Sequence, residues 1–255
     1  PPVTELVKTR AEAQITLGRN RELLSEQIKI AAAKGAKIII TSEMSVVGYP
    51  DIPELPSDED NFQTREQVAP WTEPIPGTTT KYFGSLAKSL GVYLQIGLIE
   101  ESETKFYNVA VAIGPEGKIL AKHRKVSLFH LEEVYYTPGT SGTTYKTPAG
   151  IIGMMICADV YDYSVLAQYR GNTDALALST SWAEQNTGWT WFKAAARQTG
   201  ATMLASNQPY FPDSGVVDSR GKVQSHIRQT TEGIAYGYLP LKATSSNTNS
   251  ASPKK

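Results

Sequence analysis

Short apolar runs alternate along the chain with longer segments in which apolar residues recur every three or four positions. The short runs predict β-strands at residues 37–41, 93–99, 108–113, 151–156, 175–178 and 202–206. The helical spacing predicts glycine-terminated helices over residues 79–90 and 189–199, and a short helix near residues 163–168. Strands that alternate with helices, and with hairpin turns such as residues 115–117, indicate an α/β fold with a helix-covered sheet.

The N-terminal segment allows two interpretations up to residue 15. Its odd-numbered residues from 7 to 15 would line one face of a strand, but three charged residues between 8 and 12 would then lie on the other face. The same stretch is equally compatible with a helix. After it, a helix is predicted to begin at an Asn20 N-cap, to carry its apolar face over residues 24–31 and to end at Gly35.

Two segments do not follow this alternation. Residues 45–76 contain six prolines and an acidic patch. So long a loop inside a compact domain is usually functional, and its place directly after Glu43 predicts that it forms part of a site rim. Residues 243–255 are rich in Ser, Asn and Thr and are predicted to be a flexible tail, which leaves residues 1–242 as one domain.

Three of the apolar runs finish in one chemically reactive side chain. Glu43 follows the run at residues 38–40, Lys125 closes the run that begins at Ile119, and the single cysteine, Cys157, follows residues 150–156. A thiol needs a base to become a nucleophile, and the oxyanion formed by its attack on a carbonyl needs a nearby cation. A lone cysteine in an apolar strand is more often inert, so the hypothesis of catalysis depends on all three residues meeting.

Composition excludes several classes of function. The 25 basic and 25 acidic residues balance, so no nucleic-acid partner or membrane surface is indicated. No apolar stretch approaches the roughly 20 residues of a membrane span. No metal-ligand spacing, phosphate-binding glycine pattern or serine-hydrolase elbow is present, so neither a metal nor a cofactor is expected. One cysteine cannot form an intrachain disulfide, which favours a reducing, cytoplasmic location, although the first residue is not Met, as in a processed form.

Several short motifs, taken in order, resemble the nitrilase superfamily of carbon–nitrogen hydrolases. They surround the three reactive residues and the strands that follow: Thr41-Ser-Glu43-Met, Gly48-Tyr-Pro, Lys122-His-Arg-Lys125-Val-Ser-Leu-Phe, Thr137-Pro-Gly139, Gly153-Met-Met-Ile-Cys157-Ala-Asp159, Ser179-Thr-Ser-Trp182 and Ala205-Ser-Asn207. Each motif is weak alone, and their order and spacing carry the resemblance. It covers nearly the whole chain.

This resemblance implies an α-β-β-α sandwich, a four-layer α/β fold, in which strand ends bring the three residues together. It implies Cys157 as the nucleophile, Glu43 as the general base and Lys125 as the cation that stabilises the oxyanion. A second catalytic glutamate is expected between the lysine and the cysteine, and Glu132 and Glu133 compete for this role. The short spacing from the lysine favours Glu133.

The resemblance also implies contacts with the substrate and with a second subunit. The backbone N–H of Ala158 is expected to bind the oxyanion, and Tyr49, Trp182 and Glu132 are expected to lie on the substrate side. Members of the family commonly form homodimers or larger homo-oligomers through the helix after the cysteine. Here that helix carries an apolar-aromatic set, which packs either against a partner or internally: Tyr161, Tyr163, Leu166 and Tyr169.

Departures from the family pattern refine the expected reaction. Nitrile-cleaving members carry Trp-Glu after the cysteine, whereas this chain has Ala158-Asp159, which favours amides. Many members place an arginine for a substrate carboxylate where this chain has Tyr161. The sequence therefore predicts a thiol hydrolase that cleaves a small linear amide or a carbamoyl compound. Nitrile hydrolysis and acyl transfer through the same triad, or a catalytically silent scaffold, are the alternatives.

Overall fold

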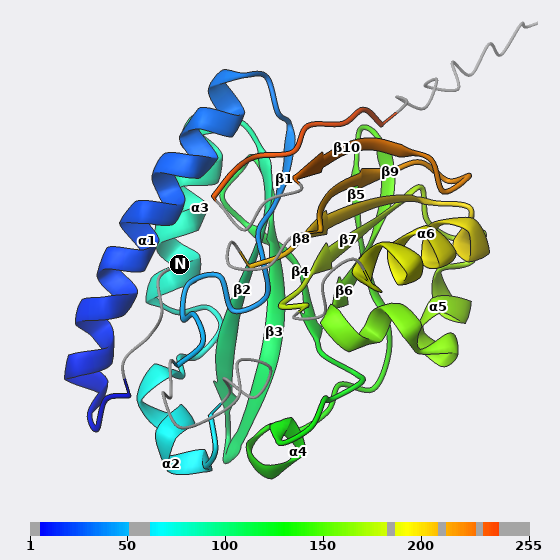
Figure 1. The fold of residues 1–255 in the computed structure, drawn as a ribbon. Helices are drawn as coiled ribbons and strands as arrows, with labels where there is room; N and C mark the ends of the chain where they lie inside the picture. Colours follow the sequence, from blue (N-terminus) through cyan, green and yellow to red (C-terminus); the bar gives the residue numbers. More distant parts are fainter. Residues whose placement is uncertain (1–5, 51–61, 183–186, 209–212, 228–231, 240–255) are drawn as a thin grey trace, which may run out of the picture.

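The computed structural model describes residues 6–50, 62–182, 187–208, 213–227 and 232–239 of the chain. These residues form two β-sheets packed face to face, and helices cover the outer face of each sheet (Figure 1). The predicted α-β-β-α sandwich is therefore confirmed. The predicted tail at residues 243–255 lies outside the described residues.

The first sheet has four strands in the order β1-β2-β3-β4, with β1 parallel to β2 and the other neighbours antiparallel. Two long helices cover its outer face (Figure 1). The strands are β1 (Ile38–Ile40), β2 (Tyr93–Ser102), β3 (Lys105–Ile113) and β4 (Ile119–Arg124). The helices are α1 (Arg10–Ala33) and α3 (Thr78–Leu90).

The second sheet has six strands in the order β10-β9-β8-β7-β6-β5. Its three central strands are parallel and the outer pairs are antiparallel. The strands are β5 (Thr143–Thr147), β6 (Gly150–Ile156), β7 (Ala175–Ser179), β8 (Thr202–Ser206), β9 (Ser214–Val217) and β10 (Val223–Ile227). Its outer face is covered by α5 (Tyr163–Tyr169) and α6 (Thr187–Thr199).

Strand alternation divides the apolar side chains among three layers of core. Along β3, Val109 and Val111 face the helices α1 and α3, whereas Ala110 and Ala112 face the second sheet. Along β7, Leu176 and Leu178 face α5 and α6, whereas Ala175 and Ala177 face the first sheet. Because successive strand residues point to opposite faces, a run that is apolar throughout is buried on both sides.

Helix α1 begins ten residues earlier than the Asn20 cap predicted from the sequence. Thr9 is the N-cap: its Oγ1 accepts from the Glu12 amide at 3.3 Å, and Glu12 Oε2 accepts from the Thr9 amide at 2.9 Å. This reciprocal pair satisfies the first free amides of the helix, which decides the ambiguous N-terminal segment in favour of a helix. Asn20 instead lies buried within the helix and donates Nδ2 to the carbonyl of Val46 at 2.9 Å.

The proline-rich segment contains two short helices that the sequence did not reveal. They are α2 (Arg65–Val68) and the 3₁₀ helix Ala69–Trp71, and Trp71 is fully buried. Residues 51–61 of this segment lie outside the described residues, so its role as a site rim stays a prediction. Two further short helices lie near the candidate site: α4 (Glu132–Tyr135) and the 3₁₀ helix Cys157–Tyr161.

Gly97 in β2 lets the turn that carries Glu43 lie directly on the strand. A Cβ at this position would lie 2.6 Å from the amide nitrogen of Met44 and 2.8 Å from the carbonyl oxygen of Ser42. We expect Gly97→Ala to lower the free energy of unfolding by about 1–3 kcal/mol because backbone atoms must shift. Gly18→Ala on α1, where the nearest atom is 3.7 Å away, should instead raise it by about 0.5–1 kcal/mol. Urea unfolding of both variants measures the difference, and equal effects would contradict this account.

Candidate active site

The ammonium of Lys125 lies buried between two carboxylates. Its Nζ is 2.8 Å from Glu43 Oε1 and 2.7 Å from Glu132 Oε2. The exposed fractions of the three side chains are only 3%, 1% and 4%. Buried charges are stable only when paired, so the arrangement fixes the positions of all three groups.

Asn108 on β3 joins the two carboxylates. Its Nδ2 donates to Glu43 Oε1 at 2.7 Å and to Glu132 Oε1 at 3.0 Å. Its main-chain carbonyl accepts from the Lys125 amide at 2.9 Å, so the same residue also aligns the lysine backbone. Glu132 is further held by the amide of Phe129, which donates to Oε2 at 2.8 Å.

Glu43 lies where β1 turns toward the second sheet. Its amide donates to the carbonyl of Thr180, the residue after β7, at 3.4 Å. Its carbonyl accepts from Gln208 Nε2 at 2.6 Å. Both partners belong to the second sheet or its loops, so the carboxylate is held by main-chain contacts between the sheets as well as by its ion pair.

Cys157 follows β6 directly, and its backbone adopts a left-handed conformation with φ of 43°. Non-glycine residues rarely take this conformation, and those that do cluster at functional sites. The carboxylate of Asp159 holds the turn: Oδ2 accepts from the Ile156 amide at 2.9 Å and lies 2.9 Å from His123 Nε2.

The same carboxylate connects the cysteine turn to the lysine strand. Asp159 Oδ1 accepts from the amides of Val126 and Ser127 at 3.0 and 2.9 Å, immediately after Lys125. Asp159 and His123 are completely buried. This pair therefore fixes the distance between the ends of β4 and β6, and with it the position of the thiol relative to the ammonium.

Electrostatics assign a protonation state to the resting site. Burial, with the Glu43 carboxylate adding to its effect and Lys125 opposing it, raises the pKa of the Cys157 thiol to about 12. Burial acts to lower the pKa of Lys125, but attraction to Glu132 and Glu43 outweighs it and raises the pKa well above its usual value. Burial raises the pKa of Glu132; Lys125 lowers it and the Glu43 carboxylate adds to the rise. The thiol is therefore protonated at neutral pH, and the lysine is charged.

This protonation state predicts an unusual pH profile for alkylation of Cys157. The thiolate is the reactive form, and a raised pKa keeps it scarce below pH 12. The labelling rate of an ordinary thiol levels off above its pKa, near pH 8.5. We expect the rate of iodoacetamide labelling of the resting protein to keep rising above this pH, by about tenfold per pH unit. Glutathione in the same buffers is the control. A plateau of the protein rate below pH 9 would contradict the raised pKa.

Removing the Asn108 side-chain amide should lower activity while Glu43, Lys125 and Glu132 stay in the site. Asn108→Leu removes one donor from each carboxylate, so the pKa of Glu132 should rise further because its charged form loses a hydrogen bond. We expect kcat for a reaction at Cys157 to fall about 10–100-fold, with the acid limb of its pH profile displaced upward. Asn172→Leu, at an exposed asparagine far from these groups, is the matched control. Equal losses in the two variants would contradict a positioning role.

The structure separates the two candidate second glutamates by position, and their catalytic roles stay predictions. Glu133 was favoured by sequence spacing, but its side chain is exposed, and Glu132 is the residue beside Lys125. Both belong to the single turn α4, where adjacent residues point about 100° apart, so only one of them faces the site.

The other predicted contacts are distributed around the site. Ala158 is buried directly after the cysteine, and Tyr49 belongs to the core under α1 and α3. Trp182 donates Nε1 to Thr187 Oγ1 at 2.7 Å and packs edge-on against Tyr161 with ring centroids 6.0 Å apart. Tyr161 ends the short 3₁₀ helix that begins at Cys157, and burial, with a smaller contribution from the Cys157 thiolate, raises the pKa of its hydroxyl. The roles of all these residues in binding substrate stay predictions.

Sequence reasoning missed Asn108, Asp159 and Gln208 as supports of the site. Asn108 had a usable signal, because it is a polar residue within an otherwise apolar strand, and such residues are normally buried for a hydrogen bond. The sequence drew attention to Asp159 only because it differs from the glutamate of the nitrile-cleaving members. Gln208 comes after β8 and carries no signal that the sequence alone reveals.

A metal site is absent from the part of the chain that the structure describes, since no three His, Cys, Asp or Glu side chains there could hold an ion. None of the described helices is both long and apolar enough to cross a membrane.

Comparison with known proteins relates the chain to carbon-nitrogen hydrolases. The family profile described as carbon-nitrogen hydrolase matches residues 11–247. A nitrilase from Pyrococcus abyssi is 33% identical over 143 residues, which cover 55% of this chain and 50% of that protein. The omega-amidase NIT2 of Mus musculus is 31% identical over 195 residues, which cover 68% of this chain and 70% of that protein. The chain thus spans about half the length of the first relative and more of the second.

A solved structure shares the same architecture. A mutant of the amidase from Nesterenkonia sp. AN1, in complex with butyramide, matches with a TM-score of 0.69 and 19% sequence identity. The match covers 89% of this chain and 83% of the amidase. At this level of identity the likeness shows a shared fold.

Proposed function

The chain belongs to the carbon–nitrogen hydrolase family, and from this premise we propose that it is an amidase that cleaves small linear amides through a thioester on Cys157. The observation that carries the proposal is the buried Lys125, held between Glu43 and Glu132. A cation with two carboxylates in a dry site, next to a protonated thiol, supplies the parts that acyl transfer to sulfur needs.

In the first half-reaction, Glu43 accepts the thiol proton as the sulfur attacks the amide carbonyl carbon. Coupling proton transfer to attack is required because the resting thiol is protonated. The charged Lys125 and the Ala158 amide stabilise the oxyanion of the tetrahedral intermediate. Glu43 then returns the proton to the leaving nitrogen, the C–N bond breaks, and the acyl group remains on sulfur.

In the second half-reaction, Glu43 accepts a proton from water, whose oxygen attacks the thioester carbonyl. The second tetrahedral intermediate forms at the same position and is stabilised by the same donors. Collapse expels the sulfur, which recovers its proton from Glu43, and releases a carboxylic acid. Glu132 keeps the ammonium in place through both steps.

An aromatic wall near the thiol supports an uncharged substrate. Tyr161 packs against Trp182 and Trp191 with ring centroids 6.0 and 5.5 Å apart. Tyr161 also occupies the position at which many relatives have an arginine for a substrate carboxylate. A short aliphatic amide suits this wall, and butyramide is the molecule bound by the related amidase.

Matched substrates test the proposal. We expect ammonia release from butyramide, and a butyryl hydroxamate when hydroxylamine replaces water as the acceptor. Butyronitrile is the matched control and should react at least about 100-fold more slowly, a difference of roughly 2.7 kcal/mol in activation free energy. Reaction of the nitrile alone would favour the nitrile-cleaving alternative. No reaction with either compound, across a panel of amides and carbamoyl compounds, would favour the silent scaffold.

The proposed homodimer rests on a smaller surface than the sequence suggested. Leu166 and Tyr169 pack internally, with 4% and 1% of their surface exposed. Tyr163, which is 70% exposed at the start of α5, has the most surface of the set left to meet a partner, and Tyr161 is partly exposed. Light scattering should give twice the monomer mass, and a monomer at micromolar concentration would remove this part of the proposal.

A further inference from the structure

Thr180 lies between the proposed base and the proposed nucleophile. It follows β7 directly, and the parallel pairing of β6 with β7 places Ile156 opposite Ser179. Cys157 and Thr180 are the next residues after this pair, so they lie at the ends of neighbouring strands, which run about 4.8 Å apart. The main-chain carbonyl of Thr180 also accepts the Glu43 amide at 3.4 Å. The residue thus binds the base through its main chain and adjoins the cysteine through its strand.

The main chain of Thr180 is fully hydrogen-bonded, but its side chain is not. Its amide donates to the carbonyl of Ser206 at 2.9 Å, and its carbonyl binds Glu43. The side chain is completely buried, and its hydroxyl has no hydrogen-bond partner within the part of the chain that the structure describes. A buried hydroxyl without a partner is costly, and the methyl group of a valine would occupy the same space without this cost. The hydroxyl therefore requires an explanation from function.

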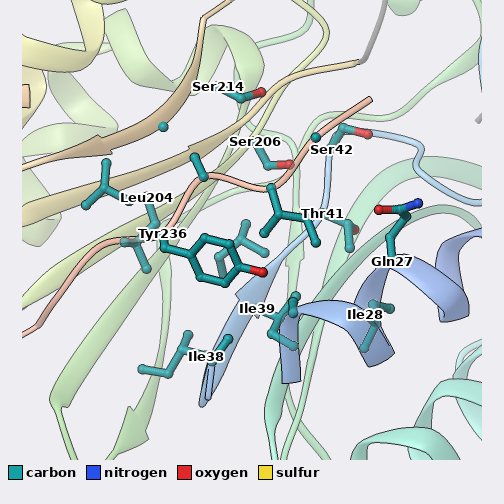
Figure 2. A pocket seen from close by; sticks show the side chains of 18 of the residues that line it. Gln27, Ile28, Ile38, Ile39, Thr41, Ser42, Leu204, Ser206, Ser214 and Tyr236 are labelled. Atoms are coloured by element: carbon teal, nitrogen blue, oxygen red, sulfur yellow. The ribbon is translucent and has the colours of Figure 1, made fainter. Parts of the chain in front are cut away.

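A neighbouring cavity does not supply the missing partner. Its volume is about 750 Å³, and its lining includes Thr41 and Ser206, the residue whose carbonyl binds the Thr180 amide (Figure 2). Thr180 itself does not line this cavity, and neither does Glu43 or Cys157. The group that meets the hydroxyl therefore belongs to the candidate active site.

The sulfur of Cys157 is a group whose demand for hydrogen bonds changes during the reaction. A protonated thiol is a weak acceptor, but charge develops on the sulfur as Glu43 removes its proton. Hydrogen bonds to charged acceptors are about twice as strong as those to neutral ones. Burial has the largest effect on the pKa of the Cys157 thiol and raises it, whereas the Thr180 side chain lowers it. The threonine therefore favours the anionic sulfur.

We propose that the Thr180 hydroxyl is a further catalytic group, which donates a hydrogen bond to Cys157 Sγ whenever the sulfur carries negative charge. The inference rests on the proposed reaction at Cys157. During attack, the thiol proton passes to Glu43 and the S–C bond forms, while the hydroxyl keeps its own proton and donates to the sulfur. In the second half-reaction the C–S bond breaks with its electron pair on sulfur, and the hydroxyl stabilises this anion until Glu43 returns the proton. Because the hydroxyl has no partner in the resting site, the interaction stabilises the transition states more than the ground state.

Iodoacetamide labelling tests the contact without any amide substrate. We expect Thr180→Val to lower the labelling rate of Cys157, at a fixed pH where the parent rate still rises with pH, by about 3–10-fold. The thiolate loses one hydrogen bond, and the greater nucleophilicity of a more basic sulfur offsets part of the loss. Thr180→Ser keeps the hydroxyl and should stay within about twofold of the parent. Thr144→Val, the same substitution at an exposed position of β5, should leave the rate unchanged. Equal labelling of the parent and Thr180→Val would overturn the proposal.

Turnover separates a contact with the sulfur from a contact with the substrate. For butyramide we expect kcat of Thr180→Val to fall about 10–100-fold with KM within about twofold of the parent, and Thr180→Ser to restore most of the loss. A raised KM with unchanged labelling would show that the hydroxyl binds the amide, and would refute its action on sulfur. If the parent hydrolyses no amide, the proposed function fails, but the labelling comparison still decides whether the hydroxyl acts on the sulfur.

Thermal unfolding distinguishes a catalytic role from a structural one. Removing a buried hydroxyl that has no partner should leave Tm unchanged or raise it by about 2–4 °C, so Thr180→Val should be less active and no less stable. A lower Tm together with parent-like labelling would assign the hydroxyl to the fold and contradict the proposal. Should Thr180→Val not fold, Thr180→Ala removes the same hydroxyl and gives the same labelling comparison with Thr180→Ser.

Discussion

Cys157→Ala is expected to lower the rate of ammonia release from butyramide by at least about 10⁴-fold, the scale of loss when a covalent nucleophile is removed. The substitution leaves Glu43, Lys125 and Glu132 in place but removes the only atom that forms the acyl intermediate. The fold should survive, because the turn is held by Asp159 rather than by the sulfur. Alanine keeps the Cβ, so the left-handed backbone at this position gains no new strain.

Three measurements separate loss of chemistry from loss of structure. Thermal unfolding of Cys157→Ala should stay within a few degrees of the parent, and calorimetry should still detect butyramide binding. Hydroxamate formation should disappear together with ammonia release, since both need the thioester. If the variant keeps more than a hundredth of the parent rate, with hydroxamate still formed, attack by sulfur is not the mechanism.

The strands that the sequence predicted share one physical property. Strands β2, β3, β6, β7 and β8 are buried on both faces over most of their length, so their runs are mostly apolar and easily recognised. Strand β5 was missed because it forms the edge of its sheet and reads Thr-Thr-Tyr-Lys-Thr, with only Tyr145 buried. Helix α1 was started too late because buried Asn20 looks like a cap, although its partner is the Val46 carbonyl.

The candidate site was predicted in chemical type but not in geometry. Strand ends supplied the carboxylate, the ammonium and the thiol, and the order of these ends was visible in the chain. The supports could not be inferred in the same way. Gln208 meets the Glu43 carbonyl 165 positions away, and Asp159 reaches the residues after Lys125 only once β4 and β6 are packed. Such contacts depend on tertiary packing, for which a single sequence carries no local signal.

Substitution of Glu132 or Glu133 tests which of the two glutamates supports Lys125, because the structure favours the first and the sequence spacing favours the second. We expect Glu132→Gln to lower kcat for butyramide about 10²–10³-fold, the usual cost of losing one preorganised electrostatic group. Lys125 would then have Glu43 as its one remaining carboxylate partner. The stronger ion pair would make the Glu43 carboxylate less able to accept the thiol proton. Glu133→Gln should stay within about twofold of the parent, because the side chain is exposed and solvent screens its charge.

The two variants carry the same change in charge one residue apart, so any effect of net charge cancels between them. The pH profile adds an independent readout, because the pKa of Glu132 is already raised by burial and by Glu43. Removing this titrating group should alter the acid limb of kcat in Glu132→Gln and leave it unchanged in Glu133→Gln. A loss confined to Glu133→Gln would restore the assignment from sequence spacing. Equal activity in both variants would mean that Lys125 needs only one carboxylate, and that the second ion pair supports the fold rather than the reaction.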